Sequence, residues 1–202
     1  MSKLTLYGDS ISGNRLKTKW VAERLRIPFD WVETSVIAAA TRTPQFLALN
    51  PWGQVPLAVL ADGRTLSQSN AIMLHLAEGS DLIPADPYRR AKMFEWLFWE
   101  QYSHEPVIAV RRFRVKFRNL RDDETDKTLA TKGDAVLARM NEALATQGYF
   151  TGDALTLADI ALVAYTRWAE EGAYDLSAHP RLTAWIARVE RDLGLPSTRE
   201  RA

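Results

Sequence analysis

Residues 50–70 constrain the fold of this chain more than any other stretch of the sequence. An apolar run at 55–60 carries a proline, Pro56, at its second position. Proline has no N–H and interrupts the hydrogen bonds of a central strand, so Pro56 belongs at a strand start, at an edge or in a special peptide bond. The Asp-Gly pair at 62–63 predicts a tight hairpin turn, and a short return strand is expected at 65–66.

A polar triplet, Gln68-Ser69-Asn70, directly precedes a helical run at residues 71–77. Small polar residues at a helix start lie beside unpaired backbone N–H groups and the positive end of the helix dipole. Anions bind readily at such positions. The triplet therefore predicts a site suited to a carboxylate.

The residues around this hairpin predict an α/β domain that we expect to comprise residues 1–79. Apolar alternation predicts a strand at 4–7, and helical spacing predicts a helix at 16–25. A second strand is expected at 29–33 and a short helix at 44–49. With the hairpin and the helix after it, the predicted order is β-α-β-α-β-β-α, and its first β-α-β unit should be a right-handed crossover between parallel strands.

The composition then changes. Residues 80–87 are rich in Gly, Pro and Asp and predict a linker, and residues 88–202 predict an all-helical domain with a kink at Pro106. Thr156 with Asp159 three residues later predicts a capping box, to which we assign a structural role. The helices expected in this half lie at residues 88–121, 124–144 and 180–193.

Composition excludes several classes of function. The 202 residues carry 26 Lys and Arg against 25 Asp and Glu, a net charge of +1, so no global charge predicts binding to nucleic acid or to an anionic membrane. The chain has no cysteine, which excludes disulfides, thiolate metal sites and catalysis by a protein thiol. Its three histidines show no metal-ligand spacing, and we expect no metal. No signal peptide or membrane-spanning run is recognisable, so a soluble cytoplasmic protein is expected.

Taken together, the motifs resemble those of soluble, cytosolic-type glutathione S-transferases. The matching pieces span residues 4 to about 190 in the order and spacing of that family. The resemblance implies an N-terminal thioredoxin-like domain, a C-terminal helical bundle domain, a cis peptide bond between Val55 and Pro56, and a homodimer acting in detoxification. The pieces that carry it are Tyr7–Lys17, Phe46, Asn50–Pro56, Gln68–Asn70 and Leu155–Asp159.

The resemblance also implies a site for glutathione as co-substrate. The backbone of Val55 would pair with the glutathione main chain as an added strand does. Gln68 and Ser69 would hold the γ-glutamyl carboxylate and amine. The residues expected near the glycyl end are Gln54 and, less directly, Thr41 or Arg42.

The catalytic position has several candidates. Members of the family use a hydroxyl or thiol at the end of the first strand to bind the glutathione sulfur, and Tyr7 lies too early, within the strand. Counted back from the helix, the serine-type position falls on Ser12, with Asn14 as an amide that also contacts the sulfur and Ser10 as the fallback. This assignment points to a serine-type, bacterial-like class related to the theta, zeta and nu classes. From the residues alone, Ser12 and Asn14 can equally be caps of the following helix.

Two clusters of residues in the helical half can be explained either by a function or by structure alone. Four arginines at helical spacing, from Arg111 to Arg121, superficially suggest a nucleic-acid patch, but we expect a solvated or subunit-contact face because the basic and apolar faces are separated. The aromatic residues between Phe94 and Tyr102 are expected to be mostly core, although the resemblance implies that some line a pocket for the second substrate. The candidates left open for that pocket are Phe94, Phe98, Tyr102, Arg111 and Arg112.

The function expected is a glutathione transferase that activates bound glutathione as a thiolate for attack on a hydrophobic electrophile. One alternative keeps the enzyme and changes the reaction to glutathione-dependent isomerisation or peroxide reduction. The other is a non-catalytic interaction protein of the same fold. Retention of Val55-Pro56 and Gln68-Ser69 argues against it, because a scaffold does not need a tripeptide site.

Overall fold

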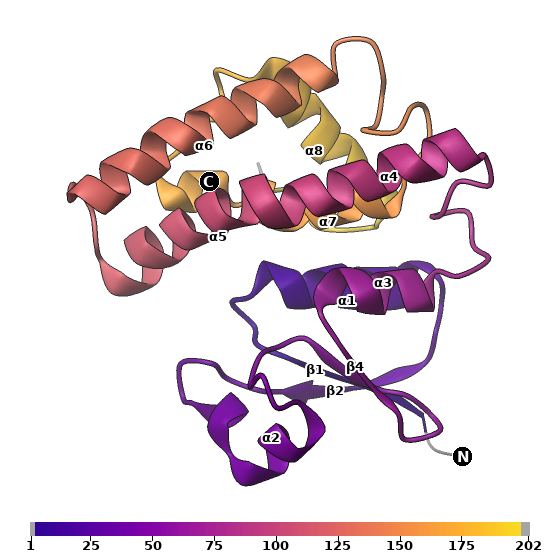
Figure 1. The fold of residues 1–202 in the computed structure, drawn as a ribbon. Coiled ribbons are helices and arrows are strands. Elements are labelled where there is room, and N and C mark those ends of the chain that lie inside the picture. Colours follow the sequence, from indigo (N-terminus) through magenta and orange to yellow (C-terminus); the bar gives the residue numbers. More distant parts are fainter. Residues whose placement is uncertain (1–2, 199–202) are drawn as a thin grey trace. The chain divides into compact units, whose positions relative to one another are not determined.

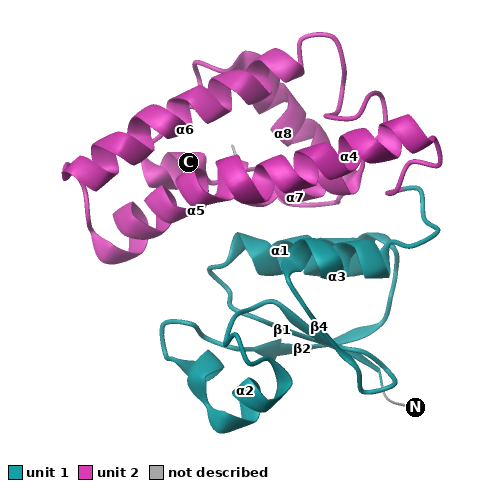
Figure 2. Ribbon diagram, in the orientation of Figure 1, with its two compact units in different colours: residues 1–81 teal, residues 82–202 magenta. Residues whose placement is uncertain are grey.

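The computed structural model describes residues 3–198, and the chain divides into two compact units, one up to Asp81 and one from Leu82 (Figure 2). Unit 1 has the predicted order of strands and helices, so the α/β prediction is confirmed. Its elements are β1 (Leu4–Gly8), α1 (Gly13–Arg24), β2 (Phe29–Glu33), the 3₁₀ turn η1 (Ala40–Arg42), α2 (Pro44–Leu49), β3 (Leu57–Val59), β4 (Thr65–Ser67) and α3 (Ser69–Leu76).

The sheet of unit 1 has the strand order β2-β1-β3-β4. Strands β1 and β2 are parallel, as the predicted crossover requires, and β1–β3 and β3–β4 are antiparallel. Helices α1 and α3 cover one face of the sheet and α2 lies on the other (Figure 1). The core between the sheet and the two helices is the apolar cluster of Leu4, Leu6, Ala22, Ala58 and Ile72.

Two helices of unit 1 begin earlier than the apolar pattern predicts. Helix α1 starts at Gly13 rather than at residue 16, and α3 starts at Ser69 rather than at residue 71. Their first turns are polar, so helical apolar spacing does not detect them. As a result Asn14 and Ser69 belong to first helical turns, where backbone N–H groups are unpaired.

Unit 2 is entirely helical apart from turns and loops, as predicted. Every residue of its helix Leu157–Thr166 is buried, which makes that helix the centre of the unit. None of the helices within residues 3–198 is both long and apolar enough to cross a membrane. The elements are α4 (Pro87–Trp99), the π-helical turn η2 (Glu100–His104), α5 (Glu105–Arg112), the π-helical turn η3 (Phe113–Phe117), α6 (Glu124–Ala143), α7 (Leu157–Thr166), the 3₁₀ turn η4 (Ala169–Gly172) and α8 (Pro180–Asp192).

The predicted capping box forms at the start of α7. One carboxylate oxygen of Asp159 accepts the Thr156 N–H over 3.0 Å. The other accepts the indole N–H of Trp185 over 2.9 Å and the Phe150 N–H over 3.0 Å. Asp159 is fully buried, so these donors replace the water that a carboxylate requires. Through these bonds Asp159 connects the start of α7, the segment around Phe150 and helix α8.

The helical run from α4 to η3 passes through Pro106. The π turn η2 ends just before this proline, and helix α5 then continues. A proline ring conflicts with the carbonyl four residues earlier, here that of Tyr102, and a wider π turn accommodates the conflict. The predicted irregularity therefore takes the form of a π turn in η2 rather than a break at Pro106.

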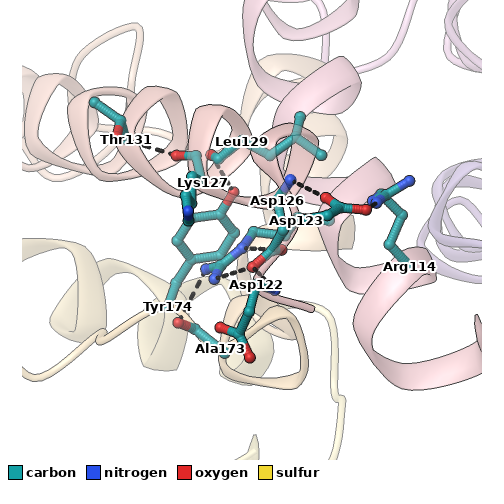
Figure 3. A network of polar contacts seen from close by, with 10 residues as sticks. Arg114, Asp122, Asp123, Asp126, Lys127, Leu129, Thr131, Ala173 and Tyr174 are labelled. Atoms are coloured by element: carbon teal, nitrogen blue, oxygen red, sulfur yellow. Dashed lines mark hydrogen bonds and ion pairs between the residues drawn. The ribbon is translucent and has the colours of Figure 1, made fainter. Parts of the chain in front are cut away.

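The arginine face predicted to be solvated or to contact a second subunit is partly buried within unit 2, so that expectation is wrong for Arg111. The Arg111 guanidinium donates to Asp126 over 2.9 and 3.3 Å and lies 4.8 Å from the ring centre of Tyr174. The Tyr174 hydroxyl in turn donates to the Leu129 carbonyl over 2.8 Å (Figure 3). This network joins α5, α6 and the segment after η4. Arg112 is also buried and pairs with Glu171 over 2.6 Å.

The aromatic residues of α4 and η2 divide into two groups. Trp96 is buried and packs its ring 4.6 Å from that of Phe150, as expected of a core residue. Phe98 is 71% exposed and Tyr102 is 88% exposed, so these two, which were left open as candidates for the second-substrate pocket, do not belong to the core. Phe94 stacks on Phe98 with ring centres 6.2 Å apart.

Candidate active site

The topology of unit 1 brings the predicted site residues to one end of the sheet. Leu57 is paired with Tyr7 on one side and with Ser67 on the other. In both antiparallel pairs, moving back from Leu57 corresponds to moving forward from its partner. Val55, two residues before Leu57, is therefore directed toward the loop after β1 on one side and toward Ser69 on the other. Three segments far apart in sequence therefore meet beside the starts of α1 and α3.

Ser12 lies at the N-cap position of α1 but does not cap it. Its backbone is extended, with φ −88° and ψ 124°, and its N–H donates to the Asp9 carbonyl over 3.0 Å. The Ser12 hydroxyl makes no hydrogen bond to any residue in the described range 3–198. The geometry therefore does not favour the interpretation of Ser12 as a cap of α1.

Asn14 connects α1 to α3. Its side-chain oxygen accepts a hydrogen bond from the Ser69 hydroxyl over 3.2 Å. Ser69 is the first residue of α3 and is buried. The two helix starts are thus adjacent, and both direct partial positive charge to this end of the sheet.

Gln68 precedes α3 in a backbone conformation that is rare for a residue with a side chain, φ 72° and ψ 117°. Its carbonyl accepts the Ile72 N–H over 3.0 Å, which is the first bond of the helix. Its side chain is exposed. Strained backbone of this kind concentrates at ligand-binding positions.

The peptide bond between Val55 and Pro56 is cis, as the resemblance implied. Strand β3 starts only at Leu57, so Val55 lies just outside the ladder. Within the described chain, the N–H and C=O of Val55 make no hydrogen bond. They are available to pair with the main chain of an extended ligand.

Thr41 and Arg42 lie in the turn η1, close to the 50–54 turn. A Cβ atom built on Gly53 would be 2.6 Å from the Arg42 guanidinium and 3.0 Å from the Thr41 carbonyl oxygen. Gly53 has φ +60° and therefore allows both the turn and this contact. Thr41 is buried and Arg42 is exposed. The neighbouring Gln54 has an exposed side chain.

Asn50 holds this turn, although the sequence indicated no such role for it. It is buried, and its side-chain amide donates to the Gln54 carbonyl over 2.8 Å. Its side-chain oxygen accepts the Trp52 N–H over 3.2 Å. An Asn-Pro-x-Gly turn is a sequence signal for such bonds, because asparagine side chains bond to backbone groups nearby.

Ser10, the fallback residue, is bound to the end of β2. Its N–H donates to Glu33 over 2.6 Å. Partial burial of Glu33 acts to raise the pKa of its carboxyl, but hydrogen bonds from the Trp31 indole and from Ser10 outweigh it, and the pKa lies below its usual value. Arg15, 3.8 Å from Glu33, lies over the Trp31 ring at 5.0 Å. Burial lowers the pKa of Arg15, and the nearby carboxylates oppose this effect.

Tyr7 packs within unit 1. Its ring lies edge-on to that of Phe46, with centres 6.1 Å apart. This position agrees with the interpretation of Tyr7 as a strand residue rather than the thiol-activating hydroxyl. In the part of the chain that the structure describes, no group of three or more His, Asp or Glu side chains is placed to hold a metal.

A thioredoxin-like α/β unit followed by a helical unit, with a cis proline next to an unpaired main-chain edge, defines the class of fold. Family models identify it. Residues 12–78 match the glutathione S-transferase N-terminal domain, and residues 97–192 match the glutathione S-transferase C-terminal domain. The chain belongs to the glutathione S-transferase family.

Curated relatives agree with this assignment. The chain is 32% identical over 197 residues to a glutathione S-transferase 3 of Zea mays, covering 92% of this chain and 88% of the relative. It is also 32% identical over 161 residues to a maleylacetoacetate isomerase of Rhizobium meliloti, covering 76% of this chain and 75% of the relative.

Solved structures extend the similarity to the fold. A glutathione S-transferase of Pseudomonas fluorescens superimposes with a TM-score of 0.90 at 41% identity, covering 94% of this chain and 95% of that one. A theta class glutathione S-transferase of Xanthomonas axonopodis, solved with glutathione bound, has a TM-score of 0.86 at 29% identity, covering 94% and 93%.

Proposed function

We propose that this chain is a glutathione transferase in which Ser12 stabilises the thiolate of bound glutathione for attack on a hydrophobic electrophile. One observation carries the proposal. The Ser12 hydroxyl has no hydrogen-bond partner among residues 3–198 and lies at the sheet end where the main-chain edge of Val55 and the start of α3 also meet. The position of Ser12 also supports a serine-type class, related to the theta, zeta and nu classes.

The binding roles follow from the same geometry. Val55 pairs through its backbone with the glutathione main chain, as an added strand does. Gln68 and Ser69 bind the γ-glutamyl carboxylate and amine at the start of α3, where unpaired N–H groups favour a carboxylate. Gln54, Thr41 and Arg42 bind the glycyl end. Arg42 suits this role because its guanidinium is exposed and has no ion pair in the described structure.

The chemistry requires a modest stabilisation of charge. A free thiol with a pKa of about 8.5 is only a few per cent ionised at neutral pH. Lowering the pKa by about two units requires about 2.7 kcal/mol of preferential thiolate stabilisation. The Ser12 O–H, the Asn14 amide N–H and the α1 dipole supply favourable interactions of this size. The protein otherwise orients the two substrates and stabilises developing charge.

A pH titration tests this function. Because the chain has no cysteine, glutathione is the only thiol in the mixture, and thiolate ultraviolet absorbance reports its ionisation without a background from protein thiols. We expect a depressed thiol pKa in the wild type, a restored value in Ser12→Ala and an unchanged depression in Ser10→Ala, the matched control in the same loop. A depression that survives in Ser12→Ala moves the role to Asn14 or Ser10, and absence of saturable glutathione binding overturns the function.

A second reaction is favoured by one relative. The similarity to a maleylacetoacetate isomerase supports glutathione-dependent isomerisation, in which the same thiolate adds to the substrate and is then released. The two reactions differ in their products. A transferase consumes glutathione stoichiometrically as a thioether, whereas an isomerase regenerates it, so mass spectrometry of the products separates them. A peroxidase, the remaining option, forms glutathione disulfide from two glutathiones.

We also propose a cytoplasmic homodimer acting in detoxification, with domains at residues 1–79 and 88–202 joined by a linker at 80–87. Exposed aromatic surface on unit 2 supports the dimer. Phe98 and Tyr102 are both exposed, and Tyr102 lines a groove of about 660 Å³ between η2, α5 and α6. Large apolar patches of this kind mark protein contacts. Because the aromatic face is apolar, a second copy of the same surface is its fitting partner.

A further inference from the structure

Asp9 is a buried carboxylate directly after β1, and it is bonded on two sides. Only 3% of its surface is exposed. One side-chain oxygen accepts the Ile11 N–H over 3.0 Å, and the other accepts the Val36 N–H. Its backbone carbonyl accepts the Ser12 N–H over 3.0 Å. A single residue thus fixes two successive positions of the loop that carries Ser12.

The bond from the Val36 N–H to the Asp9 side chain lies just beyond the end of the backbone pairing between β1 and β2. The parallel pairing of β1 with β2 ends where the Thr34 N–H donates to the Gly8 carbonyl over 2.8 Å. Beyond that point the Asp9 side chain, rather than a backbone carbonyl, receives the next N–H from the segment after β2. That segment leads into the turn η1, so Asp9 joins the loop of Ser12 to the segment that carries Thr41 and Arg42.

Resting on the function proposed above, we propose that Asp9 is a positioning residue for thiol activation, which holds the Ser12 hydroxyl toward the glutathione sulfur. Ser12 is the last residue of the loop, and its N–H is held by Asp9 alone within the described structure. A shift of about 1 Å in a catalytic group can reduce a rate by about a hundredfold. The bonds of Asp9 oppose such a shift.

The direction in which the thiol pKa changes when Asp9 is substituted distinguishes a positioning role from a purely electrostatic one. A carboxylate close to a thiolate repels it, so removing the Asp9 charge alone would lower the thiol pKa. Among the described residues, the Asp9 carboxylate acts on the Arg15 guanidinium, which also lies 3.8 Å from Glu33. If Asp9 acts by position, its loss instead raises the thiol pKa, because Ser12 no longer points at the sulfur.

Asp9→Asn is the test, because it keeps the size of the side chain and removes one acceptor. The asparagine oxygen accepts a hydrogen bond from either the Ile11 or the Val36 N–H. Its NH2 group then faces the other N–H and cannot accept from it. We expect the pKa of bound glutathione to rise by about one unit and kcat with 1-chloro-2,4-dinitrobenzene to fall about tenfold. We expect the Kd of S-methylglutathione, which has no thiol to ionise, to change less than about threefold.

Asp62→Asn is the matched control. Asp62 makes the same kind of turn, accepting the Arg64 N–H over 3.0 Å, but it lies in the hairpin at the other end of β3. Its substitution should leave the thiol pKa and kcat unchanged. A fall or no change of the thiol pKa in Asp9→Asn, while Ser12→Ala raises it, overturns the positioning role and leaves the transferase function intact.

Two further measurements keep the test decisive if Asp9→Asn folds poorly. Asp9→Ser retains a short acceptor for the Ile11 N–H but does not reach Val36, and it should also raise the thiol pKa. Amide hydrogen exchange of the wild type should show a protected Val36 N–H although it lies outside any strand. Rapid exchange at Val36 overturns the proposal. A wild type without any depression of the thiol pKa overturns both this role and the proposed function.

Discussion

The hydroxyl of Ser69 donates a hydrogen bond to the side-chain oxygen of Asn14 over 3.2 Å, joining the first turns of two helices that are 55 residues apart in the chain. A thiolate accepts hydrogen bonds, so the amide N–H groups of Asn14, and not this oxygen, are the side-chain atoms suited to contact a bound sulfur. The same bond orients Ser69, which is proposed to bind the other end of glutathione. The bond therefore links the proposed thiol site to the proposed γ-glutamyl site.

The first prediction is that Asn14 and Ser69 are energetically coupled in glutathione binding. In a double-mutant cycle with Asn14→Ala and Ser69→Ala, we expect a coupling free energy of about 0.5–1.5 kcal/mol, the usual net value of such a bond. Calorimetric Kd values for glutathione provide the measurement. Gln45→Ala, an exposed change on α2, serves as the control. Strict additivity of the two single variants would show that the bond does not connect the two sites.

The second prediction contrasts two glycines with positive φ. Gly53 and Gly63 have φ +60° and +86°, so an alanine at either position costs about 1–2 kcal/mol of backbone strain. Only at Gly53 would the new Cβ also press on Arg42 and on the Thr41 carbonyl, whereas Gly63 faces open space. We therefore expect both variants to be destabilised in thermal unfolding, but only Gly53→Ala to weaken glutathione binding, by about tenfold or ~1.4 kcal/mol. Equal Kd values for the two variants would contradict the role of this turn.

Local signals in the sequence were sufficient for the order of the elements in unit 1. The Asp-Gly turn and the alternating β1 residues each act over a few neighbours, and both were interpreted correctly. The local sequence left several positions open for Pro56, and its cis bond was implied only by the family resemblance. The polar triplet at Gln68 was also placed correctly, at a helix start. These features depend on backbone preferences that are independent of the rest of the fold.

The contacts that shape the site arise from long-range pairing and were not predicted. Asp9 bonds to Val36 and Ser10 bonds to Glu33, across 27 and 23 residues. Nothing in the local sequence indicates which N–H group will meet a carboxylate once β1 and β2 pair. In unit 2, the burial of Arg111 depends on Asp126 in another helix, and the π turns shift the faces that a regular 3.6-residue period assigns.

The third prediction concerns the buried pair of Arg111 and Asp126. Arg111→Met leaves the carboxylate buried with the Asp122 N–H, at 3.3 Å, as its only donor among residues 3–198. We expect unit 2 to lose about 3 kcal/mol of unfolding free energy, since breaking a buried pair costs more than the pair itself contributes. Urea unfolding followed by circular dichroism measures this loss. Arg114→Ala, which breaks the more exposed pair with Asp123 in the same network, should shift the midpoint much less (Figure 3).

The fourth prediction is a loss of stability in acid. Hydrogen bonds from Arg111, and then from the Asp122 N–H, hold the pKa of Asp126 below its usual value. The native state therefore binds this proton less readily than the unfolded state, whose carboxyl has a pKa of about 3.9. The stabilisation is complete above that value and is lost as the pH falls through the lower folded-state pKa. Unfolding free energies measured between about pH 7 and pH 3 should fall more steeply for the wild type than for Asp126→Asn. Parallel curves would rule out Asp126 as a contributor.

The last prediction concerns the exposed aromatic surface of α4 and η2. If Phe98 and Tyr102 form the contact between two copies, Phe98→Glu places two carboxylates in an apolar interface, which is strongly unfavourable. Sedimentation equilibrium should then give the mass of a dimer for the wild type and of a monomer for the variant. Tyr88→Glu is the control, since Tyr88 is 73% exposed on the same helix but lies about 80° around the axis from Phe98. A monomeric wild type, or a dimer that tolerates Phe98→Glu, would show that this surface is not the contact between two copies. Every group of the proposed glutathione site belongs to unit 1, so a monomeric Phe98→Glu variant should still bind glutathione.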